Sequence, residues 1–352
     1  METSANMNVS LPSVANTTRA GLFERIFLKE YIITGRVLTP TWPIIFLFGL
    51  VSNTINIAVF IKTGMKDNVT ILLVSLALSD FTFLCLATPS MSAFVILTYA
   101  RNWQWPFDYR FASFLFYWPA FTAYDLSAFI SVTLSVVRCA CVAMPLKFKL
   151  VFTTSRTIKM VLLLVILAVS LRVPVLTIFR VAWRTDPSTN VSSVYVRPVN
   201  RVAMSQINDI LNRGFVVWFN YAIVITCVSV LSYKLYQASK IRRSCIANNQ
   251  PETIDQASEK TATLGLSPKD LQVIKSVVLV CSIFILSQLP FMLYSTARLI
   301  RPELSASSEY GPLFAIFTNI SQTCSYLNAS LNIFVYYNYN SRFRAVFLAM
   351  VA

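Results

Sequence analysis

Seven long apolar stretches constrain the fold of this chain more than any other feature of its sequence. They occupy residues 40–61, 69–98, 112–143, 158–180, 214–237, 271–299 and 311–337. Each holds about 20 or more mainly apolar residues, which is the length that a bilayer core requires. In hydrocarbon, backbone polar groups are satisfied only within helices or closed barrels, and the short alternating segments of a barrel are absent. The sequence therefore predicts an all-α membrane protein with a seven-transmembrane helix bundle.

Composition agrees with a membrane protein and excludes several other classes. Of the 352 residues, 56% are hydrophobic and only 13% are charged, which is too apolar for a soluble domain. The net charge of +15 fits basic loops beside anionic lipid, so nucleic acid is not expected as a partner. The chain has no His, which excludes His-based catalysis and His metal sites. We expect a protein that is not an enzyme.

The apolar stretches divide the chain into four regions. Residues 1–38 are polar, lack the apolar core of a signal peptide and are predicted to be an extracellular N-terminal segment. Residues 39–338 form the transmembrane domain. Within it, residues 238–268 contain the polar run NNQPETIDQASEKTATLG and are predicted to be a flexible third intracellular loop. Residues 339–352 are predicted to hold a short amphipathic eighth helix and the C-terminus.

Orientation is indicated by loop charges and by glycosylation sequons. A small excess of Lys and Arg in alternate loops favours an extracellular N-terminus in the plasma membrane. Asn8, Asn16 and Asn190 begin Asn-X-Ser/Thr triplets that would all lie outside, as glycosylation requires. Three further triplets would lie in the cytoplasm or the membrane, so such triplets also occur by chance. None of the seven cysteines falls in an extracellular loop, and no disulfide is predicted.

Polar side chains inside the spans are costly and point to functional regions. Residues 328, 332 and 336 follow one another at intervals of four and share one helical face. Facing lipid, these groups would be unsatisfied, so we expect this face to turn into the bundle, with Asp80 as its partner. Two interpretations stay open: a hydrogen-bond network that holds the helices together, and a hydrated pocket for a small cation. The residues concerned are Asn53, Asp80, Ser127, Asn328, Asn332 and Tyr336.

Arg138 ends the apolar run of the third span, in TLSVVRCACVAMPLKF, without a charged neighbour. It follows Ser127 by eleven residues, about three turns, so both side chains share the face that turns inward. Asp270 begins the sixth span and would pair with Arg138 if spans three and six pack together. Such an ionic latch would be a two-state element. The alternative is that Arg138 extends to a lipid phosphate.

Asp125 in the third span and Arg172 in the fourth are predicted to face each other, because lone charges at that depth are expensive. The pair is either a polar floor to a ligand cavity or a structural pair without ligand contact. The outer loops add many arginines and fewer acids, which would attract anions or simply form a solvated rim. These arginines are Arg101, Arg110, Arg180, Arg184, Arg197, Arg201, Arg298 and Arg301.

The order of these motifs resembles the rhodopsin-like G-protein-coupled receptor family from residue 40 to residue 350. The matching segments are GLVSN with Asn53, SLALSD with Asp80, VRC with Arg138, SQLP with Pro290, NIFVY with Tyr336, and NSRFR at the start of the eighth helix. The resemblance implies a receptor that binds an extracellular ligand and activates a heterotrimeric G protein.

The resemblance also implies roles for individual residues. Arg138 would hold the inactive state through Asp270 and would contact the G protein on activation, beside Tyr233 and Tyr336, with Pro145 in the second inner loop at the same face. An allosteric sodium ion, the only cofactor expected, would bind among Asp80, Ser127, Asn328 and Asn332, beside Asn53. Ala128, Ile225 and Phe284, with Gln288 and Pro290, would form the packing cluster that transmits activation. Candidate ligand-cavity residues are Asp125, Arg172, Tyr124, Gln288 and Tyr326.

Several motifs depart from the family pattern. Val137 replaces the acid before the arginine, Ser113 stands at the usual cysteine of the third helix, and Gln288 replaces a tryptophan. Isoleucines at positions 225 and 333 replace helix prolines. So divergent a pattern resembles molluscan chemosensory receptors and FMRFamide-type peptide receptors.

The sequence thus predicts a chemosensory receptor for a small anionic molecule or a peptide. An FMRFamide-like neuropeptide receptor is the alternative within the same family. A seven-helix channel or transporter is a third hypothesis, and it would need charged rings or paired broken helices. Only one polar cluster, around Asp80, is found in the spans, which disfavours that hypothesis.

Overall fold

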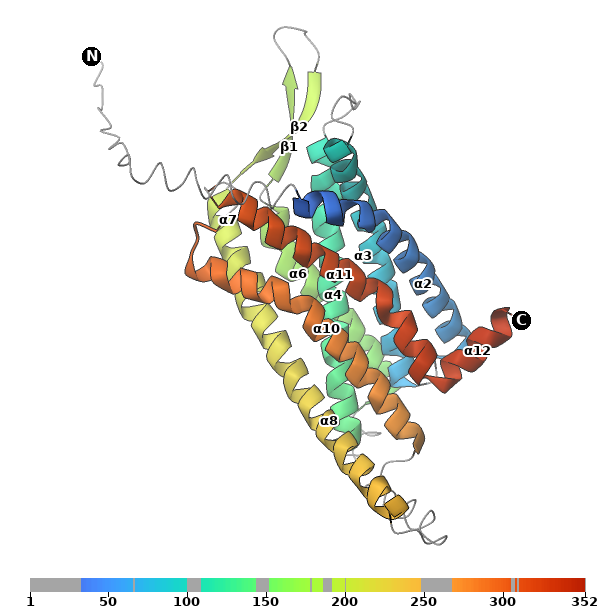
Figure 1. Cartoon of the computed structure of the whole chain (residues 1–352). Helices are drawn as coiled ribbons and strands as arrows, with labels where there is room; N and C mark the ends of the chain where they lie inside the picture. Colours follow the sequence, from blue (N-terminus) through green and yellow to red (C-terminus); the bar gives the residue numbers. More distant parts are fainter. Residues whose placement is uncertain are drawn as a thin grey trace, which may run out of the picture.

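A tilted bundle of long helices makes up the computed structural model of this chain (Figure 1). The structure describes residues 33–65, 67–99, 109–143, 152–177, 179–185, 192–199, 201–247, 268–304, 308 and 310–351. Within these ranges seven helices exceed twenty residues. They are α2 (Trp42–Thr63), α3 (Asn68–Tyr99), α4 (Tyr109–Ala143), α6 (Thr154–Leu176), α8 (Val217–Ala247), α10 (Pro268–Ile300) and α11 (Gly311–Tyr339).

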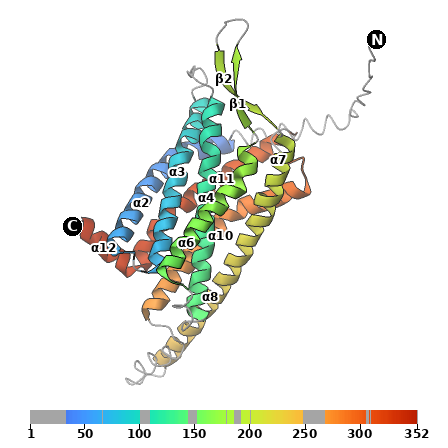
Figure 2. The same cartoon turned by 180° about the vertical axis from the view of Figure 1, so that it is seen from behind.

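Shorter elements complete the fold. The 3-10 turn η1 (Thr39–Thr41) leads into α2, and α7 (Arg201–Asn208) and the π-helical η2 (Asp209–Val216) lead into α8 without a break. The eighth helix of the prediction is α12 (Ser341–Val351), which turns away from the end of α11 (Figures 1 and 2).

Local sequence explains where several helices begin and end. Gly64 ends α2 with a φ of 93°, a conformation that glycine adopts without a steric penalty. Asp67 precedes α3, and its carboxylate accepts a 2.9 Å bond from the backbone N–H of Thr70. Asn340 does the same for α12, where its side-chain oxygen accepts a 3.0 Å bond from the N–H of Phe343. These caps satisfy N–H groups that have no partner within the helix.

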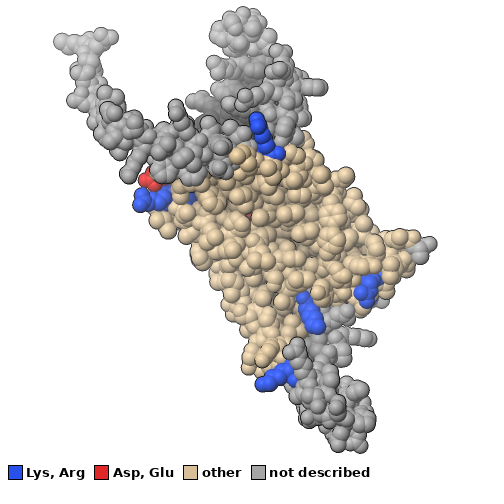
Figure 3. Space-filling view, in the orientation of Figure 1, with Lys and Arg blue, Asp and Glu red and all other residues tan. Residues whose placement is uncertain are grey.

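The surface of the bundle matches a membrane environment. On the face drawn in Figure 3, Lys and Arg lie toward the two ends, with a broad and nearly uncharged belt between them. In the described part of the chain, six helices are long and apolar enough to cross a bilayer. The helix α11 is not among them, because much of its length carries small polar and amide side chains. Those side chains are buried: Asn319, Ser321, Thr323, Ser325, Asn328, Ser330 and Asn332.

Two apolar clusters fill the bundle, one in each half. Along α3, Leu72 and Leu76 belong to the inner cluster, whereas Phe83 and Leu84 belong to the outer one. Asp80 lies between the two pairs on the same helix and is fully buried. A polar layer therefore separates the two halves of the core.

Two features outside the bundle core differ from the sequence-based expectation. Residues after α6 form an antiparallel hairpin of β1 (Phe179–Thr185) and β2 (Ser192–Pro198), in which Val181 pairs with Val196. The segments FRVAWRT and SSVYVRP are rich in the β-branched and aromatic residues that favour strands. The predicted loop at residues 238–268 is helical up to Ala247, since α8 continues for several turns past the apolar run. Residues 33–38 are helical, although they belong to the predicted N-terminal segment. The helix α11 ends at Tyr339, just past the predicted end of the transmembrane domain at residue 338.

Close approach of α2 to its neighbours requires glycine at position 49. A Cβ atom there would lie only a short distance from the Ser330 hydroxyl and 2.5 Å from Leu84 Cδ1. We expect Gly49→Ala to cost about 1–3 kcal/mol, because overpacking a core forces the backbone apart. Melting of the detergent-solubilised protein would show a lower Tm. Gly35→Ala is the matched control, since no atom lies within 4 Å of the added methyl group; equal Tm values for both variants would contradict the prediction.

Candidate functional site

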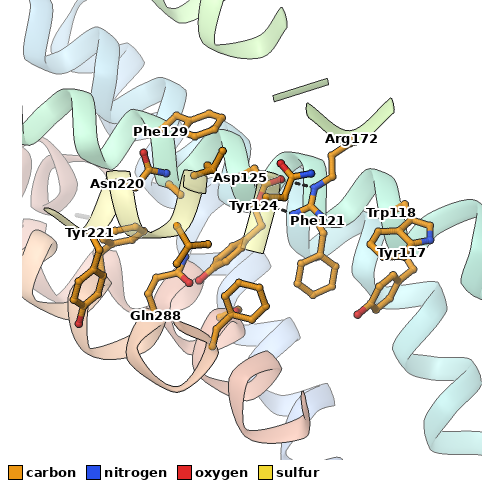
Figure 4. Close-up of a pocket in the computed structure, with 17 residues that line it drawn as sticks. Tyr117, Trp118, Phe121, Tyr124, Asp125, Phe129, Arg172, Asn220, Tyr221 and Gln288 are labelled. Carbon is orange, nitrogen blue, oxygen red and sulfur yellow. Dashed lines mark hydrogen bonds and ion pairs between the residues drawn. The ribbon is translucent and has the colours of Figure 1, made fainter. Parts of the chain in front are cut away.

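A cavity of about 90 Å³ opens among α4, α6, η2, α8, α10 and α11 in the half of the bundle that carries the hairpin. Its walls are largely aromatic, with a few amide and charged groups (Figure 4). Its lining comprises Tyr117, Trp118, Phe121, Tyr124, Asp125, Ala128, Phe129, Arg172, Asn212, Val216, Val217, Asn220, Tyr221, Phe284, Gln288, Phe291 and Ser325. We refer to it as the outer cavity.

Asp125 and Arg172 form an ion pair in the wall of the outer cavity. Arg172 donates from Nε to Asp125 Oδ2 at 2.5 Å and from Nη2 to Oδ1 at 2.7 Å, a two-bond geometry that fixes both side chains (Figure 4). The Arg172 guanidinium also lies 6.0 Å from the centre of the Trp118 ring. The predicted pairing of the two charges across α4 and α6 is thus confirmed.

Asn212 holds this part of α6 in place. Its amide donates to the backbone carbonyl of Leu171 at 2.7 Å and to the Asn208 side chain at 3.0 Å. Leu171 directly precedes Arg172, so the bond positions the backbone that carries the guanidinium. Sequence reasoning missed this residue and Asn220. Both residues are amides in a largely apolar stretch, which could have marked them. The π-helical turn η2 changes the number of residues per turn, so the α-helical spacing does not show that both line the cavity.

Tyr326 does not belong to the outer cavity, contrary to the sequence-based expectation. Its ring is fully buried against Trp42, Phe46 and Phe83, at centroid distances of 6.0, 4.6 and 5.6 Å. It therefore ties α11 to α2 and α3. The other four residues expected in the cavity line it, as the list above shows.

The Asp80 carboxylate links three helices. Ser127 on α4 donates its hydroxyl to Oδ1 at 2.5 Å, and Asn332 on α11 donates its amide to Oδ2 at 2.9 Å. Asn328 lies one turn from Asn332 and is also buried. The structure thus joins three of the predicted residues, Asp80, Ser127 and Asn332, by hydrogen bonds.

Two buried amides, Asn53 and Asn56, lie on α2. Asn53 donates to the backbone carbonyls of Gly49 and Ala329, at 2.9 and 2.7 Å. Its side-chain oxygen, and both polar atoms of the fully buried Asn56, have no hydrogen-bond partner in the described structure. Buried amides without partners are rare in proteins and mark places where water or an ion is bound. Sequence reasoning did not identify Asn56.

A second cavity, of about 240 Å³, lies at the opposite end of the bundle, and we call it the inner cavity. Arg138 and Tyr336 both line it, together with Thr70, Val277 and Val280. The Tyr336 ring packs against Phe60 at 5.1 Å.

The predicted latch, the predicted role of Pro145 and the predicted glycosylation stay open. The helices α4 and α10 pack together, as the latch requires. The Asp270 side chain lies outside the described part of the chain, as do Pro145 and the sequons at Asn8, Asn16 and Asn190.

Two residues of α8 point away from the bundle. For Ile225 this contradicts its predicted place in the packing cluster, whereas the role expected of Tyr233 on activation stays a prediction. Ile225 is 43% exposed and Tyr233 is 60% exposed, whereas Val224 and Leu231 are fully buried. Val224 takes the place predicted for Ile225 in one cluster with Ala128 and Phe284. The preceding π-helical turn η2 holds more residues per turn than an α-helix, which shifts the inward face of α8. Pro290 lies inside α10, two residues after Gln288.

A family model described as 7 transmembrane receptor (rhodopsin family) matches residues 52–336. The chain belongs to this receptor family. The match covers all seven long helices except the first turns of α2 and the last residues of α11. It identifies the seventh span as α11 despite its polar face, and it distinguishes no subfamily. A comparison with curated proteins finds no match.

Family membership indicates the general class of function that the bundle has. Members are membrane receptors with an extracellular ligand and a G-protein partner, and they are not enzymes. In the receptor described here, the outer cavity and the inner cavity lie toward opposite ends of the bundle.

The ion pair in the outer cavity should contribute to stability only as a pair. We expect Arg172→Leu to cost about 3 kcal/mol, because it leaves the largely buried Asp125 carboxylate without its partner. The double variant Asp125→Leu/Arg172→Leu should recover most of that loss. Thermal melting of the purified receptor measures both. Arg301→Leu, at an exposed arginine beyond α10, is the control and should leave Tm unchanged. A double variant no more stable than the single one would show that the residues do not act as a pair.

Proposed function

We propose that this receptor binds a small extracellular molecule with an anionic group in the outer cavity and activates a heterotrimeric G protein through the inner cavity. In this proposal it acts as a chemosensory receptor of the plasma membrane, with its N-terminus outside. The chemosensory role rests on the resemblance of its divergent motifs to chemosensory receptors.

One face of α10 carries the main support for this function. Phe291, Gln288 and Phe284 line the outer cavity, and Val280 and Val277 line the inner one. These positions follow at intervals of three and four, so they lie on one side of the helix. Between them Cys281 is fully buried and contacts Ser135 on α4 at 2.7 Å. A ligand that moves the outer part of this face therefore also moves a wall of the inner cavity.

The mechanism follows from the two cavities. A ligand activates the receptor only if it binds one arrangement of α10 more tightly than the other. Arg138 and Tyr336 lie in the wall that such a movement would open. A G protein that inserts there would favour the same arrangement, so ligand and G protein would each strengthen the binding of the other.

The chemistry of the outer cavity favours an anionic group on the ligand. Arg172 supplies a planar guanidinium in a largely apolar wall, which suits a carboxylate. The small volume favours a small molecule over a bulky peptide. The arginines at the rim add to this attraction: Arg180 and Arg301 are exposed, whereas Arg298 pairs with Asp209 at 3.0 Å.

The Asp80 cluster also fits the allosteric sodium ion that the sequence predicted. One carboxylate, one hydroxyl and amide oxygens form an oxygen donor set suited to a hard cation of single charge. In the described residues no group of three or more His, Cys, Asp or Glu side chains is present that would hold a metal ion of higher charge. Asp80, Ser127, Asn328 and Asn332 would hold the ion, whose charge would balance the carboxylate.

Sodium should stabilise the receptor through Asp80. We expect NaCl to raise the Tm of the purified receptor relative to KCl at equal ionic strength, and Asp80→Asn to abolish that difference, because an amide carries no charge to balance the ion. Thr82→Val, on an exposed face of the same helix, is the control that keeps the sodium effect. A sodium effect that persists in Asp80→Asn would place the ion elsewhere.

Loss of Arg138 should uncouple the receptor from its G protein. Cells that express the receptor with an N-terminal tag would be challenged with pooled organic anions, amino acids and peptides while G-protein activation is recorded. We expect a response in wild type that Arg138→Ala reduces at least tenfold, with tag staining on intact cells unchanged. Lys62→Ala, an exposed cation at the inner end of α2, is the matched control.

The same cells separate receptor from channel. An ionic current that survives both G-protein blockade and Arg138→Ala would contradict the proposed function and favour the channel hypothesis.

A further inference from the structure

The ion pair in the outer cavity retains unused hydrogen-bonding capacity. Arg172 uses only Nε and one N–H of Nη2, and each oxygen of Asp125 accepts one bond. A guanidinium has five N–H donors and a carboxylate about four acceptor positions, so about three donors and two acceptor positions remain. Nη1 and the second N–H of Nη2 make no hydrogen bond in the described structure, and together they form an edge of the guanidinium that is suited to a second carboxylate.

The pair makes the outer cavity electrically neutral yet strongly polar at one point. Asp125 and Arg172 are its only charged lining residues among those that the structure describes. An anion bound to Arg172 alone would lie close to the Asp125 carboxylate, and a cation bound to Asp125 would lie close to the guanidinium. In each case the attraction to one member of the pair is offset in part by repulsion from the other, and a low dielectric constant strengthens both. A ligand that carries both charges a few ångströms apart meets attraction at both ends.

The size of the cavity narrows the ligand further. Its volume of about 90 Å³ is below the roughly 150 Å³ of a cavity that binds one benzene molecule. A cavity of this volume holds only a few non-hydrogen atoms without rearrangement. The ammonium, Cα and carboxylate of an amino acid form a group of that size, with opposite charges on adjacent positions. The rings of Phe121, Tyr124 and Phe291 offer an apolar surface for the rest of the molecule.

We infer that the outer cavity binds the zwitterionic head of a free α-amino acid, with its carboxylate on the free edge of Arg172 and its ammonium on Asp125. The inference rests on the proposed function in taking the outer cavity as the ligand site. It goes further in requiring a positive group beside the anionic one. It also requires Asp125 and Arg172 to recognise the two charges of the ligand together.

Binding to the purified full-length receptor tests the inference without a G protein. Each standard amino acid would be titrated against the Tm of the receptor, beside the analogue that lacks the amino group and the analogue that lacks the carboxylate. We expect at least one amino acid with an apolar side chain to raise Tm. Its half-maximal concentration should be at least tenfold lower than that of either analogue.

Each substitution within the pair should remove a different part of this preference. Asp125→Asn should lower the advantage of the amino acid over its deaminated acid to less than threefold. Arg172→Gln should do the same for the advantage over the decarboxylated amine. The double variant Asp125→Asn/Arg172→Gln, which leaves no unpaired charge, should lose all preference even if a single variant fails to fold. Asp209→Asn is the matched control, because Asp209 pairs with Arg298 outside the cavity lining and its loss should leave the preference intact.

The outcomes separate this inference from the proposed function. A deaminated acid or a peptide that binds as tightly as every amino acid, or a set of amino acids none of which raises Tm, would overturn the inference and leave G-protein activation by another ligand standing. An amino acid that binds with the expected preference but activates no G protein in cells would support the inference and contradict the proposed function.

Discussion

The hydrogen bonds of the Asp80 carboxylate are the interaction on which the rest of the bundle depends. Helix backbones are satisfied internally, and lipid is as apolar as the side chains that face it, so apolar burial alone does little to choose one helix arrangement. A buried carboxylate with two specific donors does choose one, because leaving it unpaired is costly. Its bonds to Ser127 and Asn332 set α3, α4 and α11 in one register. The two apolar clusters then pack on either side of this fixed layer.

The sequence predicted well those features in which a buried polar group has few possible partners. Asp125 and Arg172 were expected to meet because a lone charge inside a span is costly, and the structure pairs them. The inward stripe of α11 was visible from its spacing of four. The minimum length of each span follows from the thickness of the bilayer, which is why most of the long helices appear within a few residues of the predicted ranges. The exception is α8, which continues past its predicted range to Ala247.

The features that it predicted poorly are those in which both candidate environments are apolar. Ile225 and Val224 differ little in hydropathy, so nothing in the pattern shows which one faces lipid. One π-helical turn upstream decides it. Tyr326 was misplaced for a similar reason, since an aromatic ring suits a core between α2 and α3 as well as a cavity wall. The family resemblance transferred positions along a regular helix and had no means of detecting the extra residue.

The polar character of α11 has a consequence for how the receptor is made. The translocon releases a segment into lipid largely according to the free energy of transferring that segment alone. By hydropathy α11 falls below the other six spans, because its amides and hydroxyls gain partners only inside the assembled bundle. Its stable insertion therefore depends on α2 and α3 already being in place. A substitution that disrupts an early helix would therefore leave the C-terminal end of the chain misplaced. Cellular quality control would remove such a chain before it could meet a ligand or a G protein.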